Sequence, residues 1–290
     1  MPFVALSRGG GLLPDGTATF AVDFHSQEVP PQLLAGVDVV FHLAGIAHQR
    51  AQDSVYARVN HQATLALARA SAAAGVKCFI FLSSVKAMGP AQGDAVRNEE
   101  ELSAPTNAYG LSKLQAENDL RTAFCHSEMS VVILRPSLVY GAELKGNLLS
   151  LSRAVRAGLP RPPERGGRSM LAVQDLVELM VQLATDPPRG VHTWIVCDGQ
   201  RYSARRIYDL MRAALGKGPG VSWLPLWVWR LGAYFTDGLR HRGADSRYDK
   251  LFGSELYSSA AVMAEIPWQP KLELADVVTA MMAVPQEKPQ

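Results

Sequence analysis

The chain has 290 residues, 48% of them hydrophobic, which suits one large α/β domain or a domain with a smaller lobe. A formal net charge of +2 gives no electrostatic basis for binding nucleic acid. The three cysteines, Cys78, Cys125 and Cys197, are widely spaced and form neither a disulfide framework nor a zinc motif. We therefore expect no metal site, and a location in the reducing cytoplasm.

Neither the start of the chain nor its most hydrophobic window has the pattern of a targeting or membrane-spanning segment. The first eight residues lack the long apolar stretch of a signal peptide. Residues 223–229 (WLPLWVW) are followed by Arg230 and are too short to cross a bilayer, so no transmembrane segment is expected. We favour a buried amphipathic helix here; contact with a membrane surface or a partner is the alternative.

Strand and helix patterns alternate through the first half of the chain. Apolar runs predict strands at residues 3–7, 17–24, 37–43, 77–84 and 131–134. An Ala-rich stretch over 52–74 predicts a long helix, and a second helix, which carries Tyr109, is predicted to run to about residue 124. This order predicts an α/β fold with a mostly parallel, Rossmann-like sheet and helices on both faces.

The second half is predicted to be more helical. Helices are expected at residues 146–158, 173–184, 203–215, 258–265 and 272–282, with one strand at 191–196. Residues 159–167 are rich in Pro, Gly and Arg and are interpreted as a loop. The second half is therefore predicted to be a smaller C-terminal lobe.

Tyr109 and Lys113 are the pair that most strongly indicates chemistry. Their spacing places both side chains on one helix face, one turn apart. A lysine ammonium beside a tyrosine favours the phenolate and lowers its pKa, so that the phenol can exchange protons with a hydroxyl or carbonyl oxygen. Upstream, an apolar strand ends at Ser83 and Ser84. A Tyr and a Lys on an ordinary helix surface are the alternative, because so short a motif also occurs by chance.

Five motifs stand in order along residues 3–283: FHLAG at 41–45, LSSVK at 82–86, YGLSK at 109–113, RPSLVYG at 135–141 and RSMLAVQD at 168–175. The chain resembles the extended short-chain dehydrogenase/reductases, that is, the NAD-dependent epimerase/dehydratase family. Within it, the chain is most similar to bacterial UDP-sugar 4-epimerases and 4-ketoreductases of surface-polysaccharide synthesis.

The resemblance implies a reaction at C4 of a nucleotide-activated sugar, most naturally a UDP-sugar. Tyr109 would exchange the proton at O4, Lys113 would lower the pKa of Tyr109, and Ser84 would hold the same oxygen. A ketoreductase stops after one hydride transfer, whereas an epimerase takes the hydride back on the other face. A dehydratase is disfavoured, because Val85 and Lys86 stand where that class carries an acid/base pair.

The resemblance also implies a nicotinamide cofactor, NADP or NAD. Arg8 follows the strand that meets the adenosine ribose, and no acid stands there, which favours NADP(H). A solvated arginine in a turn is the alternative. The cofactor-binding positions implied by the family are Arg8, Asp23, Phe24, Leu43, Ala44, Gly45, Ser83, Tyr109, Lys113 and Pro136.

For the substrate, the family implies Ser84, Lys86, Asn147 and Arg168, the last of which would pair with the UDP diphosphate. A guanidinium can donate two parallel hydrogen bonds to phosphate oxygens, which suits that role. Residues 1–145 would form the dinucleotide-binding region with the catalytic residues, and 146–290 mainly the substrate lobe, interleaved with the first. Arg240, Arg242 and Arg247 are further basic candidates for the diphosphate. Family analogy also predicts a homodimer.

The N-terminal region departs from the family pattern. Family members carry a strand, a glycine-rich loop and a helix before a strand like residues 3–7. Gly9, Gly10 and Gly11 do not replace that loop, because LLPDG follows and is typical of a turn. Two interpretations stay open: a truncated reading frame, or a relative with impaired catalysis that serves as a nucleotide- or protein-binding module. A third is a membrane-associated assembly factor that uses residues 223–229.

Overall fold

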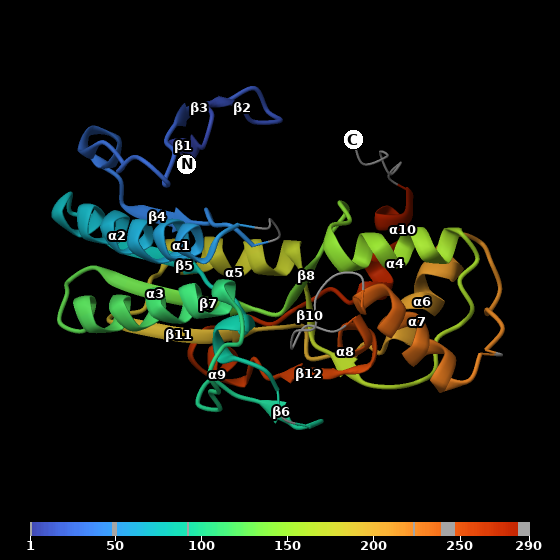
Figure 1. Cartoon of the computed structure of the whole chain (residues 1–290). Helices are drawn as coiled ribbons and strands as arrows, with labels where there is room; N and C mark the ends of the chain where they lie inside the picture. The colour runs from blue at the N-terminus through green and yellow to red at the C-terminus, as the bar shows by residue number, and fades with distance from the viewer. Residues whose placement is uncertain (1, 48–50, 92, 223, 239–246, 284–290) are drawn as a thin grey trace. The chain divides into compact units, whose positions relative to one another are not determined.

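The computed structural model describes residues 2–47, 51–91, 93–222, 224–238 and 247–283 (Figure 1). The chain forms two compact units that are interleaved in sequence. The first contains residues 1–89, 104–135 and 180–194, and the second contains 90–103, 136–179 and 195–290.

A four-stranded sheet has the order β11-β7-β5-β4. It consists of β4 (Val39–His42), β5 (Cys78–Leu82), β7 (Ser130–Pro136) and β11 (Val191–Val196). β4 pairs with β5 and β5 pairs with β7, both in parallel. β5 reads CFIFL and is almost wholly buried, because a parallel strand covered on both faces is apolar throughout. The predicted α/β fold with a mostly parallel, Rossmann-like sheet is confirmed.

Two helical segments pack on this sheet, and Figure 1 shows them beside β4, β5 and β7. One runs through α1 (Asp53–Tyr56), the π-helical turn η2 (Ala57–Gln62) and α2 (Ala63–Ala73), where a single helix was predicted. The other is α3 (Ala108–Phe124), which carries Tyr109 and ends where the sequence predicted. Their apolar faces share one core with the strands, to which α2 contributes Leu67 and α3 contributes Leu120 and Phe124.

The N-terminal residues form a separate three-stranded sheet in the order β1-β3-β2. β1 (Ala5–Ser7) lies parallel to β3 (Ala18–Ala21), and β2 (Gly11–Leu12) lies antiparallel to β3. The turn at Gly9 and Gly10 therefore leads into a strand and not into a helix, as the sequence indicated. A 3-10 turn, η1 (Pro31–Leu34), precedes β4.

The second unit contains short strands and most of the remaining helices. β8 (Leu138–Tyr140) pairs with β10 (Met170–Ala172), and β12 (Ser254–Tyr257) lies between β6 (Val96–Arg97) and β9 (Gly167–Arg168). Its helices are α4 (Gly146–Arg156), α6 (Ala204–Ala214), α7 (Leu226–Gly238), α8 (Arg247–Phe252), α9 (Ala260–Glu265) and α10 (Leu274–Ala283). α5 (Val173–Thr185) begins in this unit and ends in the first.

A buried carboxylate organises the core of the second unit. Asp198 accepts hydrogen bonds from the hydroxyls of Tyr202 (2.7 Å) and Tyr140 (3.2 Å). Burial raises the pKa of Asp198, and these hydrogen bonds act in the opposite direction. The two tyrosines also belong to the apolar cluster that joins α4, α6 and α10. This network lies within the core and is structural.

The hydrophobic segment near residue 225 forms α7 in part. Trp229 packs edge-on against Phe252 of α8, with ring centroids 5.9 Å apart, whereas Trp227 is 62% exposed. Trp223, Arg240 and Arg242 lie outside the described residues, and nothing is stated of the Arg247 side chain. Within the described ranges, no helix combines the length and hydrophobicity needed to cross a bilayer.

Candidate active site

Ser84 lies just beyond the carboxyl end of β5, where open α/β sheets bind ligands. It caps the short 3-10 helix η3 (Val85–Met88), because its Oγ accepts a hydrogen bond from the backbone N–H of Lys86 at 3.2 Å. The serine side chain is therefore held at the edge of the sheet by its own turn. Its side chain remains half-buried.

The N-terminus of α3 delivers Tyr109 to the same place. Asn107 caps the helix, its side-chain oxygen accepting from the N–H of Gly110 at 2.8 Å. Gly110 then allows η3 to approach closely: a Cβ at this position would lie 2.5 Å from the carbonyl oxygen of Lys86. The absence of a side chain at Gly110 thus lets the turn with Ser84 reach the first turn of α3.

This close approach predicts a strong effect of Gly110→Ala. The added methyl group must push η3 from α3, at a cost of about 1–3 kcal/mol, and move Ser84 relative to Tyr109. We expect a lower melting temperature and a large loss of turnover. Gly218→Ala is the matched control, because a Cβ there meets nothing within 4 Å. Equal melting temperatures and equal turnover for the two variants would contradict the proposed packing.

Tyr109 and Ser84 are hydrogen-bonded to each other through their side chains. Burial raises the pKa of Tyr109, the hydrogen bond with Ser84 lowers it, and Tyr56 raises it further. The Tyr56 ring lies edge-on to Tyr109, with centroids 6.4 Å apart. The sequence predicted a tyrosine pKa lowered by Lys113. In this structure desolvation is the largest contribution to the Tyr109 pKa, and the effect of Lys113 stays a prediction.

Lys113 lies one turn further along α3 and is only 4% exposed. Its Nζ donates to the carbonyl oxygen of Leu82 at 2.9 Å and lies 4.5 Å from the centroid of the Phe81 ring. Burial lowers the pKa of Lys113 to about 8, although the negative charge of Glu117 favours the ammonium form. The ammonium is therefore charged at neutral pH and titrates far below the usual range of lysine.

Glu117 is buried and lies four residues after Lys113, on the same face of α3. Its carboxylate accepts hydrogen bonds from Ser83 Oγ at 2.6 Å and from Arg135 Nη2 at 2.6 Å. Arg121 Nη2 donates to it at 2.9 Å. The sequence reasoning missed Glu117. The available signal was its position four residues after Lys113, together with an arginine at the end of an apolar strand.

Asn60 joins the loop after β4 to α3. Its Oδ1 accepts from the N–H of Ile46 at 2.8 Å, and its Nδ2 donates to the Ile46 carbonyl at 2.9 Å and to Ser112 Oγ at 3.2 Å. The Asn60 amide thus binds both backbone groups of Ile46. A Cβ on Gly45 would lie 3.1 Å from Asn60 Oδ1 and 3.3 Å from Lys113 Nζ.

These residues fit the nicotinamide-ribose end of a dinucleotide. Gly45 is exposed and presents bare backbone beside Lys113, so a ligand can approach closely there. The Lys113 ammonium has three N–H donors, and its one acceptor in the described residues is Leu82, which leaves donors for ribose hydroxyls. Leu43 and Ala44 are exposed along the same loop. The donor set therefore suits a polyhydroxylated ligand.

The other candidates in the first unit lie at the N-terminal sheet. Arg8 follows β1 and is exposed. Asp23 follows β3, and its Oδ1 accepts from the N–H of His25 at 3.0 Å. The Phe24 ring lies edge-on to buried His42, with centroids 5.5 Å apart, and His42 bonds Thr64 at 2.8 Å as a packing residue. Phe24 is thus linked to β4, whereas Arg8 faces solvent.

The remaining candidates are placed on separate elements. Lys86 lies in η3, half-buried. In the second unit, Pro136 ends β7, exposed Asn147 lies in the first turn of α4, and Arg168 lies in β9 opposite Glu255 of β12. Burial lowers the pKa of Arg168, and the charge of Glu255 raises it. The structure therefore brings Ser84, Tyr109, Lys113, Ser83 and Gly45 together in the first unit.

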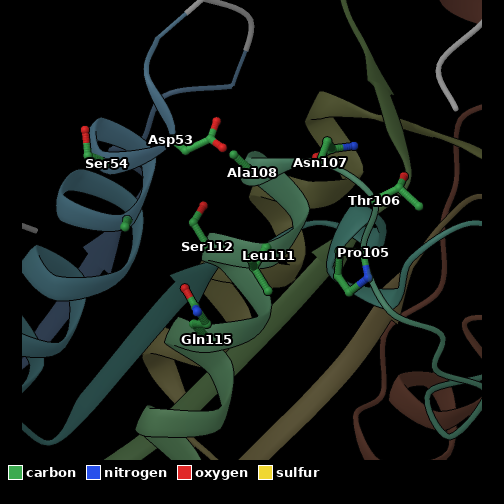
Figure 2. Close-up of a pocket in the computed structure, with 10 residues that line it drawn as sticks. Asp53, Ser54, Pro105, Thr106, Asn107, Ala108, Leu111, Ser112 and Gln115 are labelled. Carbon is green, nitrogen blue, oxygen red and sulfur yellow. The ribbon is translucent and has the colours of Figure 1, made fainter. Parts of the chain in front are cut away.

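A pocket of about 460 Å³ lies on another face of α3. Figure 2 shows Asp53 and Ser54 of α1 on one side and Leu111, Ser112 and Gln115 of α3 on the other. The segment 105–108 completes its lining. Ser84, Tyr109 and Lys113 do not line it, so we place the chemistry at the sheet edge and not in this pocket.

Comparison with known proteins decides the family. The model of the NAD dependent epimerase/dehydratase family matches residues 12–197. The UDP-glucose 4-epimerase of Vibrio cholerae is 32% identical over 285 residues, which cover 94% of this chain and 82% of that protein. The chain belongs to the NAD-dependent epimerase/dehydratase family. This confirms the resemblance drawn from the five motifs.

Other members of the family extend the comparison. The N-acetyl-alpha-D-glucosaminyl-diphospho-ditrans,octacis-undecaprenol 4-epimerase of Escherichia coli O157:H7 is 30% identical over 222 residues, covering 74% of this chain and 66% of that protein. Among solved structures, MoeE5 in complex with UDP-glucose and NAD has a TM-score of 0.72 at 23% identity, covering 93% of this chain and 86% of that one. RMD from Pseudomonas aeruginosa complexed with NADPH has a TM-score of 0.66 at 20% identity. The solved structures support the fold.

Proposed function

We propose that this protein is an NAD(P)-dependent oxidoreductase or epimerase acting at C4 of a UDP-activated sugar in surface-polysaccharide synthesis. The observation that carries the proposal is the Ser84–Tyr109 hydrogen bond with Lys113 one turn away, at the carboxyl end of β5. A hydroxyl donor, a phenol and a buried cation at one point suit a proton exchange with a sugar oxygen. Relatives named as 4-epimerases support C4 as the reacting position.

The chain's own residues would handle the proton and orient the substrate. The cofactor, when bound, supplies or accepts the hydride. Tyr109 Oη gives or takes the proton at O4, and Ser84 Oγ donates a hydrogen bond to the same oxygen as charge develops there. Lys113, charged below about pH 8, favours the tyrosinate once the proton has left. Lys113, Gly45, Leu43, Ala44 and Ser83 are the proposed contacts with the nicotinamide end, together with Pro136.

For the remaining contacts we propose the positions that the family pattern names. Asp23 and Phe24 would meet the adenine, and exposed Arg8 would favour NADPH through its 2′-phosphate. In the second half of the chain, Asn147 and Arg168 would bind the UDP diphosphate, with Lys86 contributing from η3. Residues 146–290 would thus serve mainly as the substrate lobe, and the activity would take place in the cytoplasm, in a homodimer.

A binding module without turnover is the second candidate. The observation in its favour is the Gly9–Gly10 turn, which leads into β2 and so offers no helix N-terminus for a pyrophosphate. Such a relative would bind a nucleotide or a protein through the same fold. The intact Ser84, Tyr109 and Lys113 set favours the enzyme.

One experiment separates these candidates. The purified chain is titrated with NADPH and NADH by fluorescence and then incubated with UDP-glucose and NAD⁺ or with a UDP-4-keto-sugar and NADPH. We expect saturable binding, tighter for NADPH, with Arg8→Ala removing that preference. An inverted C4 centre by proton NMR indicates an epimerase, and stoichiometric NADPH oxidation indicates a ketoreductase. Binding without either product would favour the module.

A further inference from the structure

We propose that Glu117 is a positioning residue: its carboxylate, held by a buried network with Ser83 and Arg135, lies one turn from Lys113 and keeps that lysine charged. The inference deepens the proposed function and rests on it for the role of Lys113 in turnover. The charge of Lys113 itself can be tested without any turnover.

One face of α3 carries all three groups. Tyr109, Lys113 and Glu117 follow one another at four-residue intervals, so their side chains lie on one helix face in consecutive turns. This face is turned into the protein: Lys113 is 4% and Glu117 0% exposed. In the low-dielectric interior a carboxylate one turn away acts on an ammonium group much more strongly than at the surface.

Several hydrogen bonds hold the Glu117 carboxylate in place. Oε1 accepts from Ser83 Oγ at 2.6 Å and from Arg135 Nε at 3.0 Å. Oε2 accepts from Arg135 Nη2 at 2.6 Å and from Arg121 Nη2 at 2.9 Å. Donors from the end of β5, from β7 and from α3 thus hold one carboxylate. Because Ser83 precedes Ser84, the same carboxylate also anchors the backbone that presents the Ser84 hydroxyl.

Several titratable groups lie on the elements around Lys113. His42 of β4 is neutral, because burial and the charge of Lys113 lower its pKa to about 3. Arg135 of β7 and Arg121 of α3 are cationic but bind Glu117.

Tyr56 of α1 faces Tyr109, and Lys86 of η3 adds another cation. Asp119 of α3 is paired with His61 of η2 at 2.6 Å. In the described part of the chain, Glu117 is the carboxylate that favours the Lys113 ammonium.

The charge of Glu117 determines in which direction the Lys113 pKa, and with it the pH dependence of activity, would shift. Burial alone drives Lys113 toward the neutral amine, and Glu117 opposes it, which leaves a pKa of about 8. Without the charge of Glu117, Lys113 would lose its proton at lower pH. The tyrosinate of Tyr109 would then lack its cation at neutral pH, so the alkaline limb of the activity profile would move to lower pH.

The test measures the Lys113 pKa directly in the full chain. Protein labelled with ¹³C at lysine Cε is titrated by NMR, and the Lys113→Met variant assigns the signal. We expect Glu117→Gln, which keeps the shape but removes the charge, to lower the Lys113 pKa by about one pH unit. Arg121→Gln is the matched variant. It removes a half-exposed cation from the same carboxylate, so we expect a small shift in the opposite direction.

The outcomes separate this inference from the proposed function. An unchanged Lys113 pKa in a folded Glu117→Gln protein would overturn it, as would a downward shift in Arg121→Gln. If Glu117→Gln does not fold, the sign of the shift in Arg121→Gln decides alone. A merely structural ion pair would alter melting but not the Lys113 pKa. If the NMR shift is found and the chain turns over no sugar nucleotide, the proposed function fails while the role of Glu117 stands.

Discussion

Replacing Tyr109 by phenylalanine is expected to lower turnover by about 10³-fold. The substitution removes the hydroxyl that is bonded to Ser84 and that would exchange the proton at O4. It keeps the ring that contacts Tyr56 edge-on at 6.4 Å. Affinity for NADPH and for the UDP-sugar should therefore change little. Steady-state kinetics and fluorescence titration of the same preparation measure the two quantities.

The matched control for this variant is Tyr56→Phe. It also removes one phenol hydroxyl, but from the ring that neighbours the candidate acid rather than from the acid itself. We expect the large loss only at Tyr109. Turnover by Tyr109→Phe equal to that of the unmodified chain would remove Tyr109 from the reaction and would favour a binding module.

Replacing Arg135 by leucine is expected to destabilise the fold by about 3–5 kcal/mol. Arg135 is 1% exposed and binds both oxygens of Glu117, which is completely buried. Among the residues that the structure describes, its removal leaves the buried carboxylate with Ser83 and a half-exposed Arg121 as donors. For a chain of this size the melting temperature should fall by roughly 10 °C. Thermal unfolding followed by circular dichroism provides the measurement.

Two variants show whether the unpaired charge causes this loss. Arg121→Gln removes the more exposed partner of the same carboxylate, so its cost should be below about 1 kcal/mol. In the double variant Glu117→Leu and Arg135→Leu, no charge is left buried, and much of the lost stability should return. A double variant less stable than Arg135→Leu alone would show that packing, and not the unpaired charge, dominates at this position.

Local patterns were sufficient for the fold class and for placing Tyr109 and Lys113 on one helix face. The end of the helix that carries Tyr109 and the strand at 191–196 were predicted correctly, because periodicity and apolar runs are properties of neighbouring residues. The same holds for Tyr109 and Lys113, whose spacing on a helix needs no tertiary information. The π-helical turn at 57–62 was missed, because nothing in an Ala-rich helical pattern distinguishes it.

The surroundings of the pair needed the tertiary structure. Sequence reasoning predicted that Lys113 lowers the pKa of Tyr109, whereas burial raises the pKa of Tyr109 and lowers that of Lys113. Desolvation depends on everything packed around a side chain, and most of those neighbours are distant in sequence. Asn60 and Ser112, for example, are joined across 52 positions. No local pattern records that contact.

The amino-acid sequence alone determined the alternation of strands and helices, the family motifs and the placement of Tyr109 and Lys113 on one helix face. Each of these depends only on residues that are close together in the sequence. Only the tertiary structure decided that Ser84 reaches Tyr109, since this contact depends on Gly110 lying against the backbone of Lys86. It also decided that Glu117 pairs with Arg135, because two charges become partners only when folding buries them together.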